Sequence, residues 1–166
     1  NESFSDIFGA AIERFARPDD YNWLIGEDIG THFRNMANPN AKGDPDTYFG
    51  DHWASLMGGD SGGVHTNSGV QNFWYYLLVE GGSGTNDNGD DYDVTALGVE
   101  SASAIAFRNL TVYLISSSQY DDARFYSLQA AQDLFGGCTV EVEETANAWY
   151  AVGVGDVYDA TTTADF

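Results

Sequence analysis

A histidine in a glycine-rich segment has the clearest potential for chemistry in this sequence. His65 lies in the segment Gly62–Gly69, directly before an apolar run with helical spacing. Glycines let the backbone turn tightly, so the imidazole can point into a cleft. Asp60, five residues earlier, can fix the tautomer of His65 and raise its pKa. A protonated imidazole held in this way can donate a hydrogen bond to an oxyanion. The alternative is a loop histidine that caps a helix.

A pair of carboxylates near the first residue is the second candidate. Glu2 and Asp6 are four residues apart in a helical pattern, so they share one helix face and repel each other. A zinc ion would relieve this repulsion if one carboxylate bound it and the other accepted a hydrogen bond from a histidine ligand. The alternative is two acids stabilised by the helix dipole. A glycosidase pair is disfavoured, because neighbours on one helix do not flank a glycosidic bond from opposite sides.

Two further groups could bind a ligand or an ion. Arg34 is one of only six basic residues, and in a cleft it could hold a substrate carbonyl or carboxylate, although a structural ion pair is an equal alternative. Glu13, Asn22 and Glu27 flank the bend after the first apolar helix pattern. Oxygen ligands from a helix end and the following loop suit calcium, whereas scattered surface acids are the alternative.

The elements that must position these residues are mostly helices. Apolar residues recur at helical spacing over residues 2–17, 67–80, about 99–115, about 121–135 and about 140–151. Among the residues expected on the buried faces of the first and fourth helices are Phe4, Ile7, Ile12, Phe15, Phe125, Leu128, Ala131 and Leu134. Residues 19–63 have little periodicity and predict a long ordered loop region, and residues 84–93 predict a polar, acidic loop.

These elements predict a mainly α fold, a bundle of about five helices with a long irregular loop region. The domain is expected to cover residues 1–155, with 156–166 as a linker or disordered tail. A helical pattern that begins at the first residues suggests a larger protein cut at this point.

Composition restricts the partners. The chain has 166 residues, of which 43% are hydrophobic, and this is enough for one domain with a core. Six basic against 26 acidic residues give a formal net charge of −20, which disfavours nucleic acids and anionic membranes. We expect no membrane span, because no apolar run approaches the roughly 20 residues that one requires. Cys138 is the single cysteine, so no internal disulfide can form.

Four segments in this order resemble the thermolysin family of zinc metallopeptidases, specifically its C-terminal, mainly helical domain. They are Asn-Glu-x-x-Ser-Asp at 1–6, Trp-Leu-Ile-Gly-Glu-Asp at 23–28, Arg-x-Met-x-x-Pro at 34–39 with Gly-Asp-Pro-Asp at 43–46, and residues 62–69. The resemblance extends from Asn1 to about Gly155. It implies a secreted zinc endopeptidase that acts on peptides or proteins.

The resemblance also implies roles for individual residues. Glu2 would be a zinc ligand, and Asp6 would orient a zinc-bound histidine. His65, oriented by Asp60, would stabilise the tetrahedral intermediate. The substrate-binding residues would be Arg34, which contacts the substrate carbonyl, and Phe33, which lines the adjacent pocket. The calcium ligands would be Glu13, Asn22, Leu24 through its backbone, and Glu27.

One departure from the family pattern limits what this chain can do alone. The sequence contains no His-Glu-x-x-His, the motif that supplies two zinc histidines and the water-activating glutamate. The resemblance places that motif on a helix upstream of position 1, in a catalytic N-terminal domain. We therefore expect the isolated chain to be inactive and to bind zinc weakly or not at all. The alternative function is a non-catalytic, calcium-stabilised helical binding module.

Overall fold

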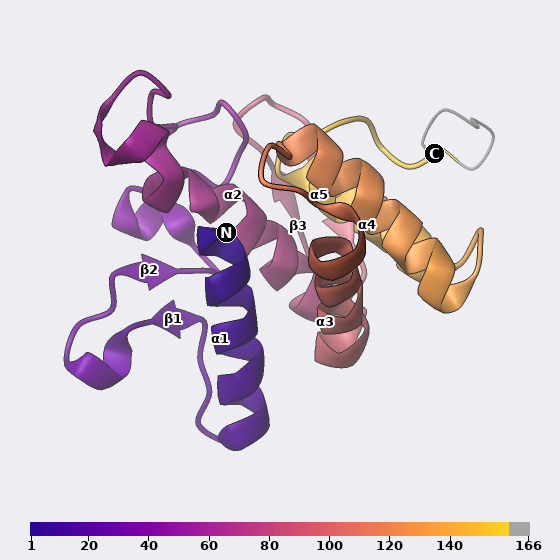
Figure 1. The fold of residues 1–166 in the computed structure, drawn as a ribbon, viewed down its shortest axis with the longest axis horizontal. Coiled ribbons are helices and arrows are strands. Elements are labelled where there is room, and N and C mark those ends of the chain that lie inside the picture. The colour runs from indigo at the N-terminus through magenta and orange to yellow at the C-terminus, as the bar shows by residue number, and fades with distance from the viewer. Residues whose placement is uncertain (160–166) are drawn as a thin grey trace.

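The fold consists of five α-helices, and one of the five lies at the centre of the molecule. The structure is a computed structural model that describes residues 1–159. Its helices are α1 (Glu2–Ala16), α2 (Gly59–Glu80), α3 (Gly98–Arg108), α4 (Tyr120–Phe135) and α5 (Val140–Ala151). The predicted mainly α class is confirmed. Helix α2 runs through the middle and packs against α1, α3 and α5, while α4 lies beside α5 (Figure 1).

Aromatic packing holds the centre of the molecule together. Trp74 of α2 stacks on Trp149 of α5 with ring centroids 4.8 Å apart, and both side chains are fully buried. The indole Nε1 of Trp149 donates a hydrogen bond of 2.8 Å to Ser127 Oγ on α4. Three helices thus meet at one buried aromatic pair whose second indole is also anchored by a polar contact.

The long region between α1 and α2 is mostly irregular, as expected, but it contains short regular pieces. Strands β1 (Leu24–Ile25) and β2 (Arg34–Asn35) pair antiparallel, with Leu24 opposite Asn35 and Ile25 opposite Arg34. Two 3₁₀ turns, η1 (Glu27–Ile29) and η2 (Pro39–Lys42), follow β1 and β2. This pairing holds Arg34 beside α1, next to the start of the helix.

The prediction of a loop over residues 84–93 was wrong, because strands β3 (Gly82–Thr85) and β4 (Asp91–Val94) form an antiparallel hairpin there. The turn between the strands is stabilised by Asn86, whose Oδ1 accepts hydrogen bonds of 3.0 Å from the backbone N–H groups of Asn88 and Asp90. All four β3 residues are exposed and show no apolar alternation, and β4 (Asp-Tyr-Asp-Val) alternates over only four residues, so the sequence signal for these strands is weak.

The helix expected over about 99–115 changes its geometry part of the way along. The α-helical part ends at Arg108, and a π-helix, η3 (Asn109–Tyr113), continues it. The side chain of Asn109 is fully buried and donates a hydrogen bond of 2.9 Å to the carbonyl of Ala123 on α4. This contact ties the wide turn to α4.

Helices α1, α4 and α5 match their predicted bounds closely, whereas α2 begins at Gly59, eight residues before the predicted start at residue 67. Some predicted core residues are exposed. Phe4 and Ile7 are buried on α1, as are Leu128 and Ala131 on α4. The predicted burial was wrong for Ile12, Phe15, Phe125 and Leu134, which are 67%, 90%, 43% and 42% exposed. The C-terminal end of α1 projects beyond the other helices (Figure 1), and the side chains of Ile12 and Phe15 stay largely uncovered there.

Of the predicted tail at 156–166, residues 156–159 contain no helix or strand, and 160–166 lie outside the described residues. Within residues 1–159, no helix combines the length and apolar character of a membrane span.

Two leucines on α4 test the core directly. We expect Leu128→Ala, at a fully buried site, to lower the free energy of unfolding by about 2–5 kcal/mol, because it removes packed methyl groups and leaves a cavity. Leu134→Ala, at a site that is 42% exposed, should change it by less than about 1 kcal/mol. Urea unfolding of both variants measures the difference. Equal effects would contradict the assigned core.

Candidate functional site

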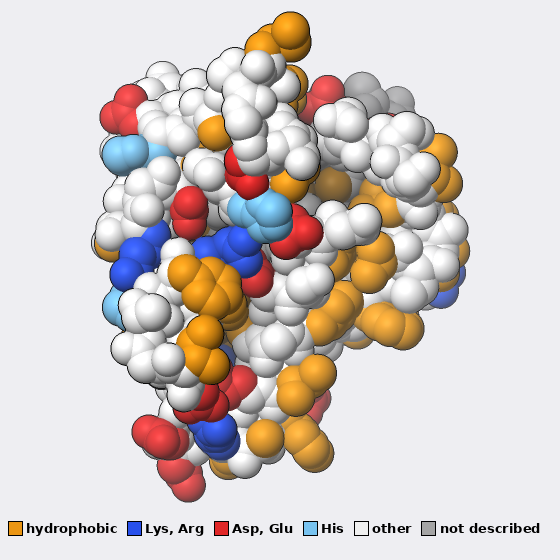
Figure 2. Space-filling view, turned by 60° about the vertical axis from the view of Figure 1, so that its left-hand side comes forward, with side chains coloured by type: hydrophobic (Ala, Val, Ile, Leu, Met, Phe, Trp, Pro, Cys, Tyr) orange, Lys and Arg blue, Asp and Glu red, His pale blue; other side chains and the backbone are white. Residues whose placement is uncertain are grey.

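The structure brings Glu2 and His65 together. Glu2 lies in the first turn of α1 and His65 in the first regular turn of α2, and Glu2 Oε2 is 3.4 Å from His65 Nε2. Both side chains are partly exposed, at 39% and 56%. On the face shown in Figure 2, acidic side chains flank a histidine, and a basic side chain lies beside them. These two residues, 63 positions apart in the sequence, therefore lie side by side at the surface.

Asp60 orients the imidazole through a strained turn. Residues 60–63 all have left-handed backbone angles, with φ between 50° and 85°, before the regular helix begins. Asp60 Oδ1 binds His65 Nδ1, and Asp60 Oδ2 accepts a hydrogen bond of 3.0 Å from the His65 backbone N–H. The hydrogen bond that the Asp60 carboxylate accepts from the ring is the main reason that the pKa of His65 is raised, and the charge of Glu2 adds to the effect. Because the Asp60 carboxylate accepts the Nδ1–H, Nε2 carries a proton only when the ring is charged, and Nε2 is the nitrogen that faces Glu2.

Asp6 occupies a different environment from Glu2, although both lie on one face of α1. Its carboxylate accepts hydrogen bonds of 3.0 and 3.1 Å from Arg34 Nη1 and of 2.8 Å from Asn72 Nδ2. Burial raises the pKa of Asp6, while Asn72 and Arg34 oppose the shift. Their charge and hydrogen bonds stabilise the ionised form, so Asp6 holds Arg34 at the edge of the groove.

Arg34 and Phe33 lie side by side, as the substrate-binding prediction requires. The guanidinium carbon of Arg34 is 5.4 Å from the centre of the Phe33 ring, a distance that allows a cation–π contact. The ring also packs on Gly26, where a Cβ atom would come within 2.3 Å of it and where φ is +96°. Only glycine fits this position. Phe33 itself is 52% exposed, which leaves its outer side accessible.

Two residues of this region were not found by sequence reasoning. Asn72 is 1% exposed and lies seven residues after His65, two turns further along α2. A buried amide within an apolar helical run was the signal. Asp44 is half-buried near Arg34, and burial raises its pKa to about 6, with Asp6 and Asp60 adding to the shift. It lies in the Gly-Asp-Pro-Asp segment at 43–46, one of the segments that carry the resemblance, but no role was predicted for it.

The predicted calcium ligands are brought only partly together. A surface hollow between α1 and the β1–η1 segment is lined by Glu13, Leu24 and Glu27. Burial raises the pKa of Glu13, and the nearby carboxylate of Glu27 raises it further. A cation between the two carboxylates would relieve this repulsion, so the oxygen donors fit calcium. Asn22 is not part of the lining, and its Oδ1 accepts a hydrogen bond of 2.8 Å from the Leu24 N–H.

A complete zinc site is not formed by the described residues. A catalytic zinc ion takes three protein ligands, and residues 1–159 contain no group of three or more His, Cys, Asp or Glu side chains able to hold a metal. Glu2 can supply one oxygen ligand, because its carboxylate is partly exposed and faces the groove. Among the described residues, Glu2 thus fits one position of such a site, and the further ligands that a catalytic zinc ion needs are not among them.

Comparison with known proteins gives a consistent result. The family described as "Thermolysin metallopeptidase, alpha-helical domain" matches residues 1–154. Bacillolysin of Bacillus cereus, thermolysin of Alicyclobacillus acidocaldarius subsp. acidocaldarius and bacillolysin of Brevibacillus brevis are each 40% identical to the chain over 162 residues. Each match covers 93% of this chain but only 27–28% of the relative.

The chain therefore corresponds to little more than a quarter of those relatives' length. The match includes both helix starts that carry Glu2 and His65, and it ends three residues after α5. The mainly helical architecture agrees with the description of the family. On these grounds the chain belongs to the family of thermolysin metallopeptidase α-helical domains.

Proposed function

We propose that this chain is the C-terminal helical domain of a secreted zinc endopeptidase. It would supply Glu2 as one zinc ligand, Asp6 as a positioning acid and His65, oriented by Asp60, as the stabiliser of the oxyanion. The observation that carries the proposal is the contact of 3.4 Å between Glu2 Oε2 and His65 Nε2. It puts the imidazole proton next to the carboxylate that would bind the metal. Two zinc histidines and the water-activating glutamate would come from an upstream N-terminal domain.

The residues of this chain would act mainly by charge and hydrogen bonding. When bound, zinc activates water and polarises the scissile carbonyl. His65 donates its Nε2 proton in a hydrogen bond to the oxygen on which negative charge develops, and Asp60 keeps the ring protonated and correctly turned. Arg34, fixed by Asp6, donates hydrogen bonds to a substrate carbonyl, and Phe33 provides an apolar wall for the adjacent substrate side chain.

The Glu2 and His65 roles predict different losses in a longer polypeptide that includes the upstream domain. Glu2→Gln should lose both bound zinc and peptide hydrolysis, because it removes a charged ligand. His65→Gln should retain zinc and lower kcat/KM by roughly 10²–10³-fold, the usual loss for one oxyanion donor. Metal analysis and peptide hydrolysis measure both effects.

The isolated 166-residue chain should be inactive in the same assay. Peptide hydrolysis by that pure chain, if a chelator inhibits it, would refute the proposal that the zinc histidines and the water-activating glutamate come from an upstream domain. A longer polypeptide that binds calcium but neither binds zinc nor hydrolyses peptides would favour the alternative, a calcium-stabilised binding module.

The Asp60–His65 contact predicts a change in titration. In the metal-free chain, Asp60→Asn should lower the pKa of His65 towards its ordinary value of about 6.5, because the hydrogen bond to a charged acceptor is lost. Proton NMR of the imidazole measures this pKa, with Glu143→Gln on α5 as the control that should leave it unchanged. An unaltered pKa in Asp60→Asn would show that Asp60 does not orient the ring.

The same contact predicts a pH dependence of stability. The pKa of His65 in the folded chain lies above its unfolded value, so its contribution to stability is complete below the unfolded pKa and is lost as pH rises through the folded pKa. In Asp60→Asn, this part of the pH dependence of the free energy of unfolding should disappear.

Calcium should stabilise the chain through the hollow lined by Glu13 and Glu27. At 100 times its Kd, a bound ion adds about 2.7 kcal/mol to the free energy of unfolding. Glu27→Gln should abolish most of this gain, whereas Asp93→Asn, in the β-hairpin, should preserve it. Without calcium, Glu27→Gln should be mildly stabilising, since it removes the carboxylate that raises the pKa of Glu13. Thermal unfolding in the presence of calcium, and separately in the presence of a chelator, measures both predicted changes in stability.

A further inference from the structure

A short turn beside the candidate site presents two apolar side chains to solvent. Residues 55–58 form the turn, in which the Gly58 N–H donates a hydrogen bond of 2.9 Å to the Ser55 carbonyl. Its two central residues are Leu56 and Met57, which are 62% and 95% exposed. Turns are usually built from Gly, Pro, Asn, Asp and Ser. Two neighbouring large apolar residues at the tip of an exposed turn therefore indicate a contact surface.

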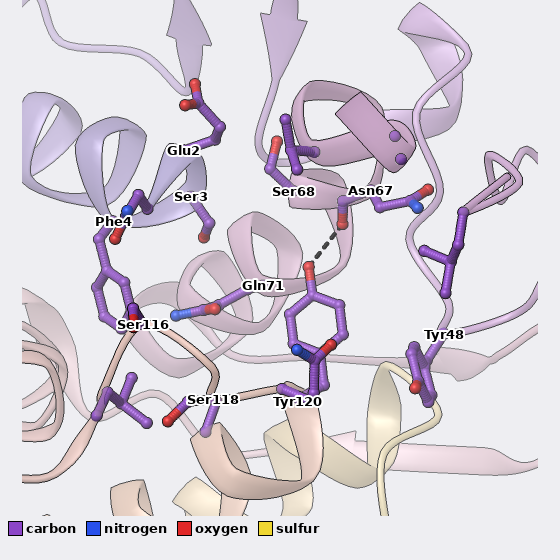
Figure 3. Close-up of a pocket in the computed structure, with 18 of the residues that line it drawn as sticks. Glu2, Ser3, Phe4, Tyr48, Asn67, Ser68, Gln71, Ser116, Ser118 and Tyr120 are labelled. Atoms are coloured by element: carbon purple, nitrogen blue, oxygen red, sulfur yellow. Dashed lines mark hydrogen bonds between the residues drawn. The ribbon is translucent and has the colours of Figure 1, made fainter. Parts of the chain in front are cut away.

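The Leu56–Met57 turn packs on the start of α2, close to the residues proposed to act in hydrolysis. Just before the turn, the Ala54 N–H donates a hydrogen bond of 2.8 Å to Asn67 Oδ1, and Asn67 Nδ2 donates one of 3.0 Å to the Ala54 carbonyl. At Gly62, a Cβ atom would come within 3.2 Å of the Leu56 carbonyl oxygen. Leu56, Asn67 and Glu2 line one hollow, in which Figure 3 shows Glu2 and Asn67. The turn is thus a direct neighbour of the candidate site.

The loop that carries the turn is fixed at its base. The ring system of Trp53 packs against the rings of Tyr48 and Phe49, with centroids 5.0 and 4.9 Å apart. The backbone N–H of Tyr48 also donates a hydrogen bond of 2.8 Å to the carbonyl of Val152, directly after α5. These contacts hold the loop in place, so its apolar tip has a defined position relative to the site.

Apolar side chains lie on both sides of the site. In Figure 1, the loop that leads into α2 lies above the N-terminal end of α1, and β2 lies below it. Phe33, directly before β2, is therefore on one side of Glu2 and His65, and the Leu56–Met57 turn is on the other. Figure 2 shows hydrophobic side chains above and below a histidine on this face. A peptide that crosses the site in an extended conformation meets both apolar groups.

We propose that Leu56 and Met57 form an apolar subsite for a side chain of the peptide substrate. The inference rests on the proposed function, and it assigns to the turn a residue on the opposite side of the scissile bond from the one that contacts Phe33. An apolar side chain fits because it removes the exposed surface of both residues from water. The unbranched thioether of Met57 adapts to aliphatic and aromatic side chains alike. Acidic side chains are disfavoured, since the sequence carries a formal net charge of −20.

Continuity with the site identifies the substrate as the occupant. Only Gly58 and Gly59 separate Met57 from Asp60, the residue that orients His65. An extended peptide advances about 3.3 Å per residue, so a peptide whose reacting carbonyl lies at His65 reaches the turn within its next few residues. Any other partner seated on the turn would obstruct the path of the substrate.

Substrate preference in the longer polypeptide that includes the upstream domain tests the subsite. Peptides that carry leucine at the residue assigned to the turn should exceed their serine counterparts in kcat/KM by roughly tenfold. The double variant Leu56→Ser/Met57→Ser should bring this ratio close to one and keep the preference on the other side of the scissile bond. Phe33→Ala should have the opposite pattern of effects. Val140→Ser, at an exposed apolar site on α5, is the control and should change neither preference.

A charge at the tip of the turn gives a test with two signs. Relative to the unchanged protein, Met57→Lys should shift the preference at the assigned residue towards glutamate, and Met57→Glu should shift it towards lysine. Each shift should be about two- to fivefold, the usual size for an exposed ion pair. If the turn had only a structural role, each variant would change hydrolysis of the glutamate and lysine peptides by the same factor.

Binding can be followed without hydrolysis. The 166-residue sequence has two methionines, Met57 at the tip and Met36, which is fully buried. In the longer polypeptide with chelator present, the leucine peptide should shift the NMR signal of the Met57 methyl group and leave that of Met36 nearly unchanged. The serine peptide should shift neither signal. Loss of one signal in Met57→Leu assigns it.

An unchanged preference in Leu56→Ser/Met57→Ser, or a Met57 signal that the leucine peptide does not move, would overturn the inference. A Met57 methyl group that is already shielded from solvent without peptide would also overturn it, because other polypeptide would then cover the turn. A Met57 shift in a protein that hydrolyses no peptide with zinc present would support the subsite and refute the proposed function. Hydrolysis without the shift and without the change of preference would do the reverse.

Discussion

The buried carboxylate of Asp6 is the constraint on which the geometry of the site depends. It is 6% exposed, and a charge in that position needs partners. Arg34 and Asn72 supply them, from β2 and α2. These contacts fix the first turns of α1 against α2, and Glu2, one turn earlier on the same face, therefore reaches the start of α2, where His65 lies. The two acids thus have different roles: Asp6 anchors α1 against α2, and the carboxylate of Glu2 remains accessible to a ligand.

The start of α2 stores conformational strain at the point where the chemistry would occur. Asp60 and Ser61 have positive φ angles without being glycine, which is unfavourable for an L-residue. In this strained conformation the Asp60 carboxylate contacts both the ring and the backbone N–H of His65, and these contacts offset part of the strain. At Gly63, a Cβ atom would come within 2.8 Å of the Asn67 amide, so the turn can close there only on glycine. The glycine-rich sequence before His65 therefore has a structural reason that concerns the histidine itself.

The helices and the two main site residues, Glu2 and His65, could be predicted from the sequence for two different reasons. Helical periodicity is strong where helices pack on one another, as at Val70, Trp74, Leu77 and Leu78, and there the helix and its end at Glu80 were predicted; the irregular start of α2, residues 59–63, has no such period. The pairing of Glu2 with His65, which are 63 residues apart in the chain, came from the family resemblance and not from spacing.

The failures have physical causes as well. The β3–β4 hairpin depends on the Asn86 turn and carries little apolar pattern. Phe15 fits the helical period but lies near the projecting end of α1, where its side chain is 90% exposed. The amide of Asn72 stands out within an apolar helical run, but nothing local indicates its partner, Asp6, which lies 66 residues away in the sequence.

The central claim is that Glu2 and His65 face one zinc ion from two helices of this domain. Anomalous diffraction at the zinc edge, from crystals of the longer polypeptide, tests it most directly. We expect one strong peak at about 2.0–2.2 Å from a carboxylate oxygen of Glu2, the usual distance for a zinc–carboxylate bond. Nε2 of His65 should point to the open side of the metal without binding it. A zinc peak remote from both residues, or no peak at full zinc occupancy of the solution, would contradict the account.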